Sequence, residues 1–160
     1  MVVLRRQGNY SLGQLQDAAT ILGLKLVRFE IGVPEIDELV AAEKRIEREK
    51  FDAVLVESHH AFLHHRRLVV DLLAGSRLPT IFPSRAYVEA GGLMSYGPNT
   101  VEVQRQTARV VDRLLHGMKV ADLPIEQPTK FELVINLKTA KTLGLTIPPM
   151  LLQRAGQVIE

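Results

Sequence analysis

Short, largely apolar runs alternate with amphipathic segments along the first hundred residues, and this alternation leaves few folds open to the chain. Val2–Leu4 and Phe51–Val56 have the composition of strands that are covered on both faces of a parallel sheet. Two more strands are predicted at 24–31 and 78–83, with a segment of helical periodicity between successive strands. We therefore expect an α/β fold: a parallel sheet in a three-layer sandwich, with right-handed crossovers and the flavodoxin-like strand order 2-1-3-4-5.

The predicted helices begin and end at residues that suit those positions. Ser11 can cap the first helix and Gly23 can end it, whereas Pro34 opens the second helix. A third helix is expected over 61–74, closed by Gly75. The remaining predicted elements are a helical turn at 84–89, a long helix at 101–115, a proline-containing connector at 118–128, a strand at 131–136, a short helix at 137–143 and a final amphipathic helix from Pro148 through Ile159.

The stretch Gly91–Asn99 is the most distinctive local pattern in the chain. It joins a glycine pair, a short apolar run and a Tyr-Gly-Pro-Asn turn, and glycine permits close backbone approaches that a Cβ forbids. Pro98 cannot donate to a β-ladder, so we expect a strand to stop there. Asn99 or Thr100 can then cap the following helix.

Composition excludes several classes of protein. The 160 residues include no cysteine, so neither a disulfide framework nor a cysteine-based zinc site can form. A net charge of +2, with basic and acidic residues interleaved, does not favour a nucleic-acid partner. The apolar run before Arg5 and Arg6 is too short for a signal peptide, so the chain as written is expected to be cytoplasmic.

Catalytic and metal-binding patterns are weak. Four of the five histidines fall within seven positions: His59, His60, His64 and His65. Two of them have the i,i+4 spacing of helical zinc ligands, but no third ligand is evident, and we expect no metal. A hydrolase would need Ser58 or Ser95 activated by His59 or His64, yet neither serine lies in a Gly-x-Ser-x-Gly elbow. The sequence also contains no phosphate-binding loop motif.

Polar residues gather in the loops that follow the predicted strands, at Gln7–Tyr10, 57–59, 83–85 and 95–99. In an open α/β sheet these loops converge on one crevice that binds small molecules. The serine hydroxyls can hydrogen-bond a polar head group, Arg85 can pair with a carboxylate, and Tyr96 can stack on a ring. The opposing interpretation is that Ser84 only caps a helix and Tyr96 only packs. The candidate ligand-binding residues are Ser58, His59, Ser84, Arg85, Ser95 and Tyr96.

The stretch Gly91–Asn99, continued by 111–117, 121–141 and 143–149, resembles the C-terminal half of bacterial ABC-transporter substrate-binding proteins of the tryptophan/tyrosine-type uptake group. The similarity is specific from Leu78 onward and looser before it. It implies one lobe of a type I periplasmic binding protein, which captures a small solute such as an aromatic amino acid between two lobes. It further implies ABC permease subunits as partners, a periplasmic or cell-envelope location for the full-length family, no cofactor and no enzymatic activity.

The resemblance also implies a division of the chain. Residues 1–98 would form the solute-binding lobe, 99–128 a helix and hinge connector, and 129–160 a returning strand with C-terminal helices. The hinge would include Leu123, Pro124 and Pro128. Because 160 residues are too few for two lobes, we expect a partial or truncated binding protein. The helix at 101–115 then needs another surface to cover it, and a second copy of the chain is one candidate. An α/β hydrolase-like enzyme or a small-molecule sensor using the same crevice stays open, as does the identity of the solute.

Overall fold

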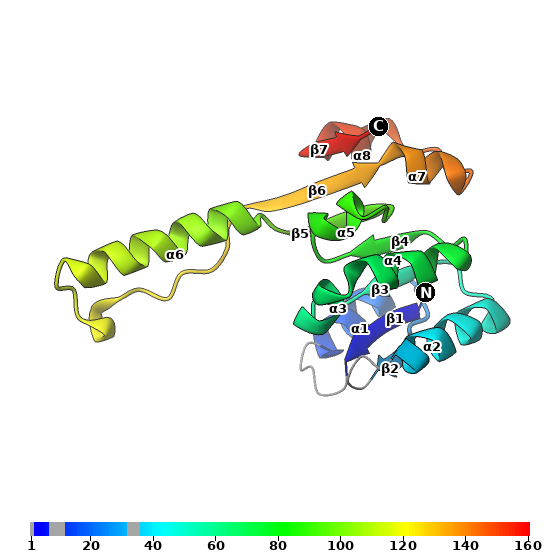
Figure 1. The fold of residues 1–160 in the computed structure, drawn as a ribbon, viewed down its shortest axis with the longest axis horizontal. Helices are drawn as coiled ribbons and strands as arrows, with labels where there is room; N and C mark the ends of the chain where they lie inside the picture. Colours follow the sequence, from blue (N-terminus) through cyan, green and yellow to red (C-terminus); the bar gives the residue numbers. More distant parts are fainter. Residues whose placement is uncertain (1, 7–11, 32–35) are drawn as a thin grey trace.

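One sheet organises the computed structural model, which describes residues 2–6, 12–31 and 36–160 (Figure 1). Its strands are β1 (Val2–Arg6), β2 (Val27–Ile31), β3 (Val54–Val56), β4 (Thr80–Phe82), β5 (Met94–Pro98), β6 (Phe131–Asn136) and β7 (Gln157–Ile159). They lie in the order β2-β1-β3-β4-β5-β6-β7. The first five strands are mutually parallel, which confirms the predicted order 2-1-3-4-5. β6 then pairs antiparallel with β5, and β7 pairs parallel with β6.

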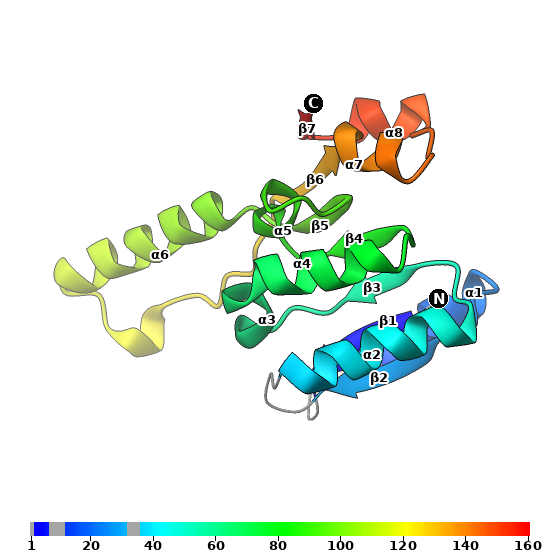
Figure 2. The same ribbon diagram turned by 45° about the vertical axis from the view of Figure 1, so that its right-hand side comes forward.

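Helices cover both faces of this sheet (Figure 2). They are α1 (Leu12–Ile21), α2 (Ile36–Glu49), α3 (His60–His64), α4 (Arg66–Gly75), α5 (Arg85–Glu89), α6 (Thr100–Leu115), α7 (Leu137–Thr142) and α8 (Pro149–Arg154). α2, α4 and α5 share one face, and α1 lies on the other. The expected caps at Ser11 and Pro34, and the loop Gln7–Tyr10, fall outside the described residues. Within the described parts, every helix is too short or too polar to cross a membrane.

The core lies between the sheet and the layer formed by α2, α4 and α5. Val54 and Val56 alternate inward on β3, and Phe82 does so at the end of β4. α2 contributes Leu39, Ala42 and Ile46, and α4 contributes Val69, Val70 and Leu73. Phe82 stacks on Tyr87 of α5 with ring centroids 4.9 Å apart and an interplanar angle of 13°. This stack fixes the position of Tyr87 at the edge of the core.

The chain departs from the predicted elements at two places. The helix expected over 61–74 is divided at His65, whose backbone (φ −95°, ψ 25°) leaves the helical region between α3 and α4. The final helix expected through Ile159 is wrong, because α8 ends at Arg154 and Gln157–Ile159 forms β7. The Gly156 N–H donates to the Leu133 carbonyl of β6 at 2.9 Å, which starts a ladder that the helical pattern could not anticipate.

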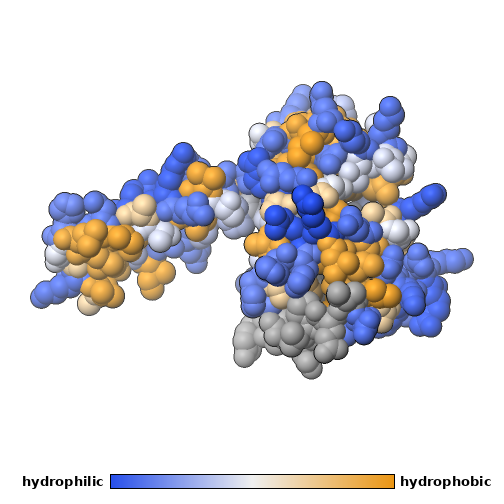
Figure 3. Space-filling view, in the orientation of Figure 1, coloured by the Kyte–Doolittle hydropathy of each residue, from blue (hydrophilic) through white to orange (hydrophobic). Residues whose placement is uncertain are grey.

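α6 and the connector project from the body as an arm, defined here as residues 100–130 (Figures 1 and 2). Asn99 caps the helix by accepting a hydrogen bond from the Glu102 N–H at 3.0 Å, and β5 ends at Pro98 as predicted. The Asn99 N–H donates to the Lys130 carbonyl at 2.9 Å, so the chain leaves and re-enters the body at one point. α6 has no buried residue, and exposed apolar side chains gather toward the tip of the arm (Figure 3). They include Val111, Leu115, Met118, Val120 and Ile125.

Candidate functional site

A cavity of about 560 Å³ lies between the carboxyl ends of the parallel strands and the base of the arm. The body contributes the loops after β3 and β4, and the arm contributes Thr100, Val103 and Gln104 from the first turns of α6. Pro128 closes the same wall from the returning segment. The cavity therefore occupies the edge at which open α/β sheets bind ligands.

Ser58 and His59 reach this cavity because β3 ends at Val56 and the chain turns into α3 beside it. The His59 Nδ1 accepts a hydrogen bond from the Ala61 N–H at 3.1 Å, so this ring nitrogen carries no proton and the imidazole caps α3. The ring packs edge-on against Phe62, with centroids 5.9 Å apart. Backbone capping and core packing thus fix the His59 ring in one orientation.

Two of the polar groups that line the cavity are buried hydroxyls. Ser84 precedes α5 but makes no capping hydrogen bond, contrary to the interpretation that it only caps a helix. Its Oγ and the hydroxyl of Tyr87 are both buried, and neither has a hydrogen-bond partner among the described residues. Burial raises the pKa of Tyr87 to about 12, against a smaller opposing effect of Arg66, so the phenol stays a neutral donor. A buried hydroxyl without a partner costs about 1–3 kcal/mol, and a ligand acceptor can recover it.

Sequence reasoning missed Tyr87, although a signal was present. Tyr87 follows Ser84 by three residues on a helical turn that starts at the ligand-binding edge, and residues at this spacing share a helix face. The wall formed by Val103 and Gln104 carried no comparable signal. Val103 and Gln104 reach the cavity only because of the direction in which α6 leaves the sheet.

The structure separates the other predicted ligand residues from this cavity. Arg85 pairs with Glu89 along α5 at 2.8 Å and does not line the cavity. Ser95 is 1% exposed on the packed side of β5, and its Oγ also lacks a partner among the described residues. Tyr96 points to the opposite face, where it is 57% exposed and stacks on Phe131 with centroids 5.7 Å apart. Of the six candidates, the cavity unites Ser58, His59 and Ser84.

Gly97 permits the close approach that shapes the cavity rim. A Cβ at this position would lie 2.0 Å from the Pro83 carbonyl oxygen, so only glycine lets the end of β5 lie against the loop after β4. Of the predicted hinge residues, Pro128 lines the cavity, whereas Leu123 and Pro124 lie farther out along the arm. Arg113 of α6 contacts Glu126 of the connector at 3.4 Å, which ties this outer part to the helix.

The lining of the cavity offers hydrogen-bonding groups and apolar surface. The Ser95 Oγ has no hydrogen-bond partner among the described residues, and the His59 Nδ1 accepts from the Ala61 N–H rather than from a serine hydroxyl. The neighbouring histidine rings pack in pairs, His59 with His60 and His64 with His65. In the part of the chain that the structure describes, no group of three or more acidic or histidine side chains could hold a metal ion.

Comparison with known proteins gives a consistent picture. The family described as ABC transporter substrate binding protein matches residues 10–159. A crystal structure described as the ABC domain in complex with L-Trp from Streptococcus pneumonia has 29% sequence identity and a TM-score of 0.85, and the match covers 99% of this chain and 54% of that one. A conserved domain protein from Vibrio cholerae has 25% identity and a TM-score of 0.82, with coverage of 98% and 53%.

A third solved structure shares the fold at lower identity. The ligand-free, open form of a substrate binding protein with adhesive properties from Clostridium difficile is 20% identical, with a TM-score of 0.68 and coverage of 99% and 53%. The chain therefore spans about half the length of the solved structures it matches. None of the curated protein sequences matches it.

Proposed function

The chain belongs to the ABC transporter substrate-binding protein family, and we propose that it supplies one lobe of a receptor that captures a small solute for an ABC permease. The family is of a solute-binding, non-enzymatic type, and we propose binding without covalent chemistry here. The observation that carries the proposal is the cavity at the carboxyl edge of the sheet, where the Ser84 and Tyr87 hydroxyls lack partners among the described residues. Such donors suit a ligand that brings an acceptor.

We propose an aromatic amino acid or a similar carboxylate as the solute. The neighbour with bound L-Trp supports this class, and a carboxylate can accept hydrogen bonds from both hydroxyls. Leu63, Pro83 and Val103 supply apolar surface for a ring. A volume of about 560 Å³ falls within the range of roughly 300–1,000 Å³ that is typical of small-molecule sites.

We further propose that the arm packs against a second lobe. The chain covers 54% and 53% of its two most similar neighbours described above, so those proteins contain a further region of similar size. The arm offers that region an unpartnered apolar face, on which Leu115 and Ile125 are 82% and 98% exposed. Closure of the two lobes would bend the chain where Asn99 and Lys130 meet, and Pro128 would stiffen the return. The proposed location is the periplasm or cell envelope, where such receptors meet their permease.

The proposal is tested by titrating the isotope-labelled chain with L-tryptophan and following backbone amides by NMR. A single lobe encloses a ligand on one side only, so we expect weak, millimolar binding with shifts centred on Ser58, Ser84 and Tyr87. Replacing Tyr87 with Phe removes one donor without changing the ring, and should raise the Kd about tenfold, or about 1.4 kcal/mol.

The matched control is Tyr96→Phe, which removes a phenol outside the cavity and should leave the Kd unchanged. Shifts that centre on the Tyr96 face, or a Kd that Tyr87→Phe does not alter, would count against this site. Micromolar affinity for L-tryptophan would contradict the expectation that residues 1–160 enclose the ligand on one side only.

A further inference from the structure

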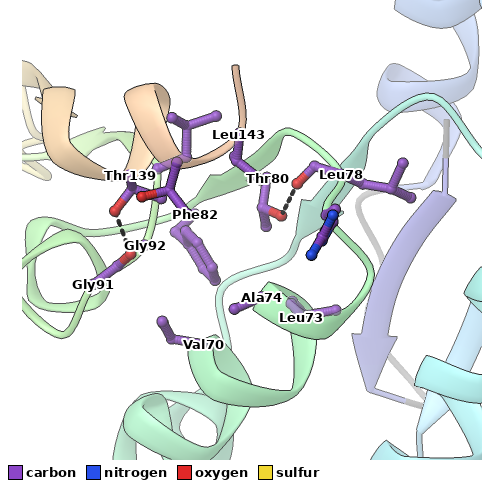
Figure 4. Close-up of a pocket in the computed structure, with 13 residues that line it drawn as sticks. Val70, Leu73, Ala74, Leu78, Thr80, Phe82, Gly91, Gly92, Thr139 and Leu143 are labelled. Carbon is purple, nitrogen blue, oxygen red and sulfur yellow. Dashed lines mark hydrogen bonds between the residues drawn. The ribbon is translucent and has the colours of Figure 1, made fainter. Parts of the chain in front are cut away.

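A second cavity, of about 240 Å³, lies at the opposite edge of the sheet (Figure 4). It is bounded by the end of α4, the first residue of β4, the Gly91–Leu93 segment that leads into β5, and α7. All these segments stand at the amino ends of the parallel strands. The cavity is therefore separate from the solute site proposed above, and no function described so far uses it.

The size and lining of this second cavity suit a small apolar group. Its volume exceeds the roughly 150 Å³ of an engineered apolar cavity that accommodates benzene. Figure 4 shows Val70, Leu73, Phe82 and Leu143 around a common space. The Phe82 ring forms part of the wall because Gly92 has no side chain: a Cβ there would lie 2.6 Å from Phe82 Cε2.

The threonine hydroxyls of the lining are satisfied within the chain. Thr139 Oγ1 donates to the Gly91 carbonyl at 2.8 Å, and Thr80 Oγ1 donates to the Leu78 carbonyl at 3.1 Å. Thr142 Oγ1 likewise donates to the Lys138 carbonyl, at 3.0 Å. The hydroxyl donors are thus already used, and they leave only lone pairs for a ligand.

Arg77 also lines the second cavity, and it is an exposed residue. Within the described ranges no hydrogen bond or ion pair engages its guanidinium, which is therefore available to a ligand at the open side of the cavity. Its backbone adopts a left-handed conformation (φ 53°) directly after α4, a position that usually carries glycine or asparagine. The cavity therefore combines an apolar interior with one cationic donor group that can form bidentate hydrogen bonds to a carboxylate.

We propose that this second cavity binds a small monocarboxylate with an apolar body about the size of a benzene ring. The apolar part of the ligand lies between Val70, Phe82 and Leu143, and its carboxylate pairs with Arg77. A neutral compound of the same size gains the apolar contact but not the charge-assisted hydrogen bonds, so the negative charge distinguishes the ligand class.

The test compares sodium benzoate with benzyl alcohol, which has a similar ring and no negative charge, in NMR titrations of the intact chain. Benzoate should shift the amides of Gly91, Thr139 and Leu143, and should bind at least fivefold more tightly than benzyl alcohol. Arg77→Asn removes the charge and keeps a residue that tolerates the left-handed backbone. It should abolish the preference for benzoate and leave benzyl alcohol binding unchanged.

Two further variants separate this site from the proposed solute site. Ala74 is exposed on α4 and lines the second cavity, so Ala74→Phe should block entry and abolish binding of both compounds. Tyr87→Phe removes a hydroxyl from the first cavity and keeps the ring that stacks on Phe82, so benzoate binding should survive it. Equal affinity for the two compounds, benzoate binding that Arg77→Asn does not weaken, or benzoate shifts that depend on Tyr87 would overturn the inference. None of these results would bear on tryptophan binding at the first cavity.

Discussion

Gly97→Ala tests whether the close packing of β5 against the loop after β4 holds the ligand-binding edge together. The added Cβ would lie 2.0 Å from the Pro83 carbonyl oxygen and 3.0 Å from its carbonyl carbon. Carbon atoms make ordinary contacts at about 3.5–4.0 Å, so one of the two segments must move by about 1 Å or more. The obstructing atoms belong to the backbone, and no side-chain rotation can relieve the clash.

The expected cost follows from this geometry. Overpacking a well-packed interior costs about 1–3 kcal/mol, and a clash with buried backbone belongs at the upper end of that range. Loss of glycine's extra freedom in the unfolded chain offsets about 0.4–1 kcal/mol of this. A net destabilisation of about 2 kcal/mol lowers the folding equilibrium constant roughly 30-fold. For a chain of this length it lowers the Tm by roughly 4–8 °C.

Urea unfolding followed by circular dichroism measures this change. Gly13→Ala is the matched control, because a Cβ at Gly13 meets nothing within 4 Å on α1. Helix propensity predicts that this control is neutral or stabilising by up to about 1 kcal/mol. An unfolding midpoint for Gly97→Ala equal to that of the parent protein would refute the packing argument.

Three further predictions concern single side chains. Because burial raises the Tyr87 pKa to about 12, ultraviolet titration should show one late phenol ionisation that Tyr87→Phe removes, and stability should fall as pH rises from 10 through 12. Asn99→Ala removes the α6 cap and a 2.8 Å hydrogen bond to Glu132, so urea unfolding should show a loss of about 1–2 kcal/mol. Lys130 and Arg105 hold the Glu102 pKa below 4.5. The stabilising contribution of Glu102 is therefore present above pH 4.5 and lost below it, and carboxyl NMR should place its midpoint below that pH.

Local sequence signals predicted those elements whose ends are determined by residues nearby in the chain. β6 occupies the predicted range 131–136, β5 ends at Pro98, and Asn99 caps α6. β7 could not be found in this way, because its ladder begins with the Gly156 N–H on the Leu133 carbonyl, more than twenty residues earlier in the chain. Partners so distant in sequence leave no trace in local periodicity, and the apolar residues after Pro148 continued to indicate a helix.

Strand order alone predicts which candidate residues share one edge of the sheet, whereas their role in ligand binding stays a prediction. Ser58, His59 and Ser84 each follow a parallel strand, so a parallel sheet brings them to one edge whatever the details of packing. Ser95 and Tyr96 lie within a strand instead, where neighbouring side chains point to opposite faces. At most one of the two could have faced any given side of the sheet, and neither lines the cavity.

The wall that α6 contributes to the cavity depends on the direction in which this helix leaves the sheet, and no local sequence pattern encodes that direction. α6 is amphipathic, and an amphipathic helix after a fifth strand ordinarily folds back to cover its own sheet. Here the hydrogen bonds of Asn99 to Lys130 and Glu132 direct α6 away from the body, so only its first turns meet the loops after β3 and β4. The same two contacts thus complete the cavity and expose the apolar face of the arm. A variant that releases the base of α6 should consequently alter ligand binding and the exposure of that face together.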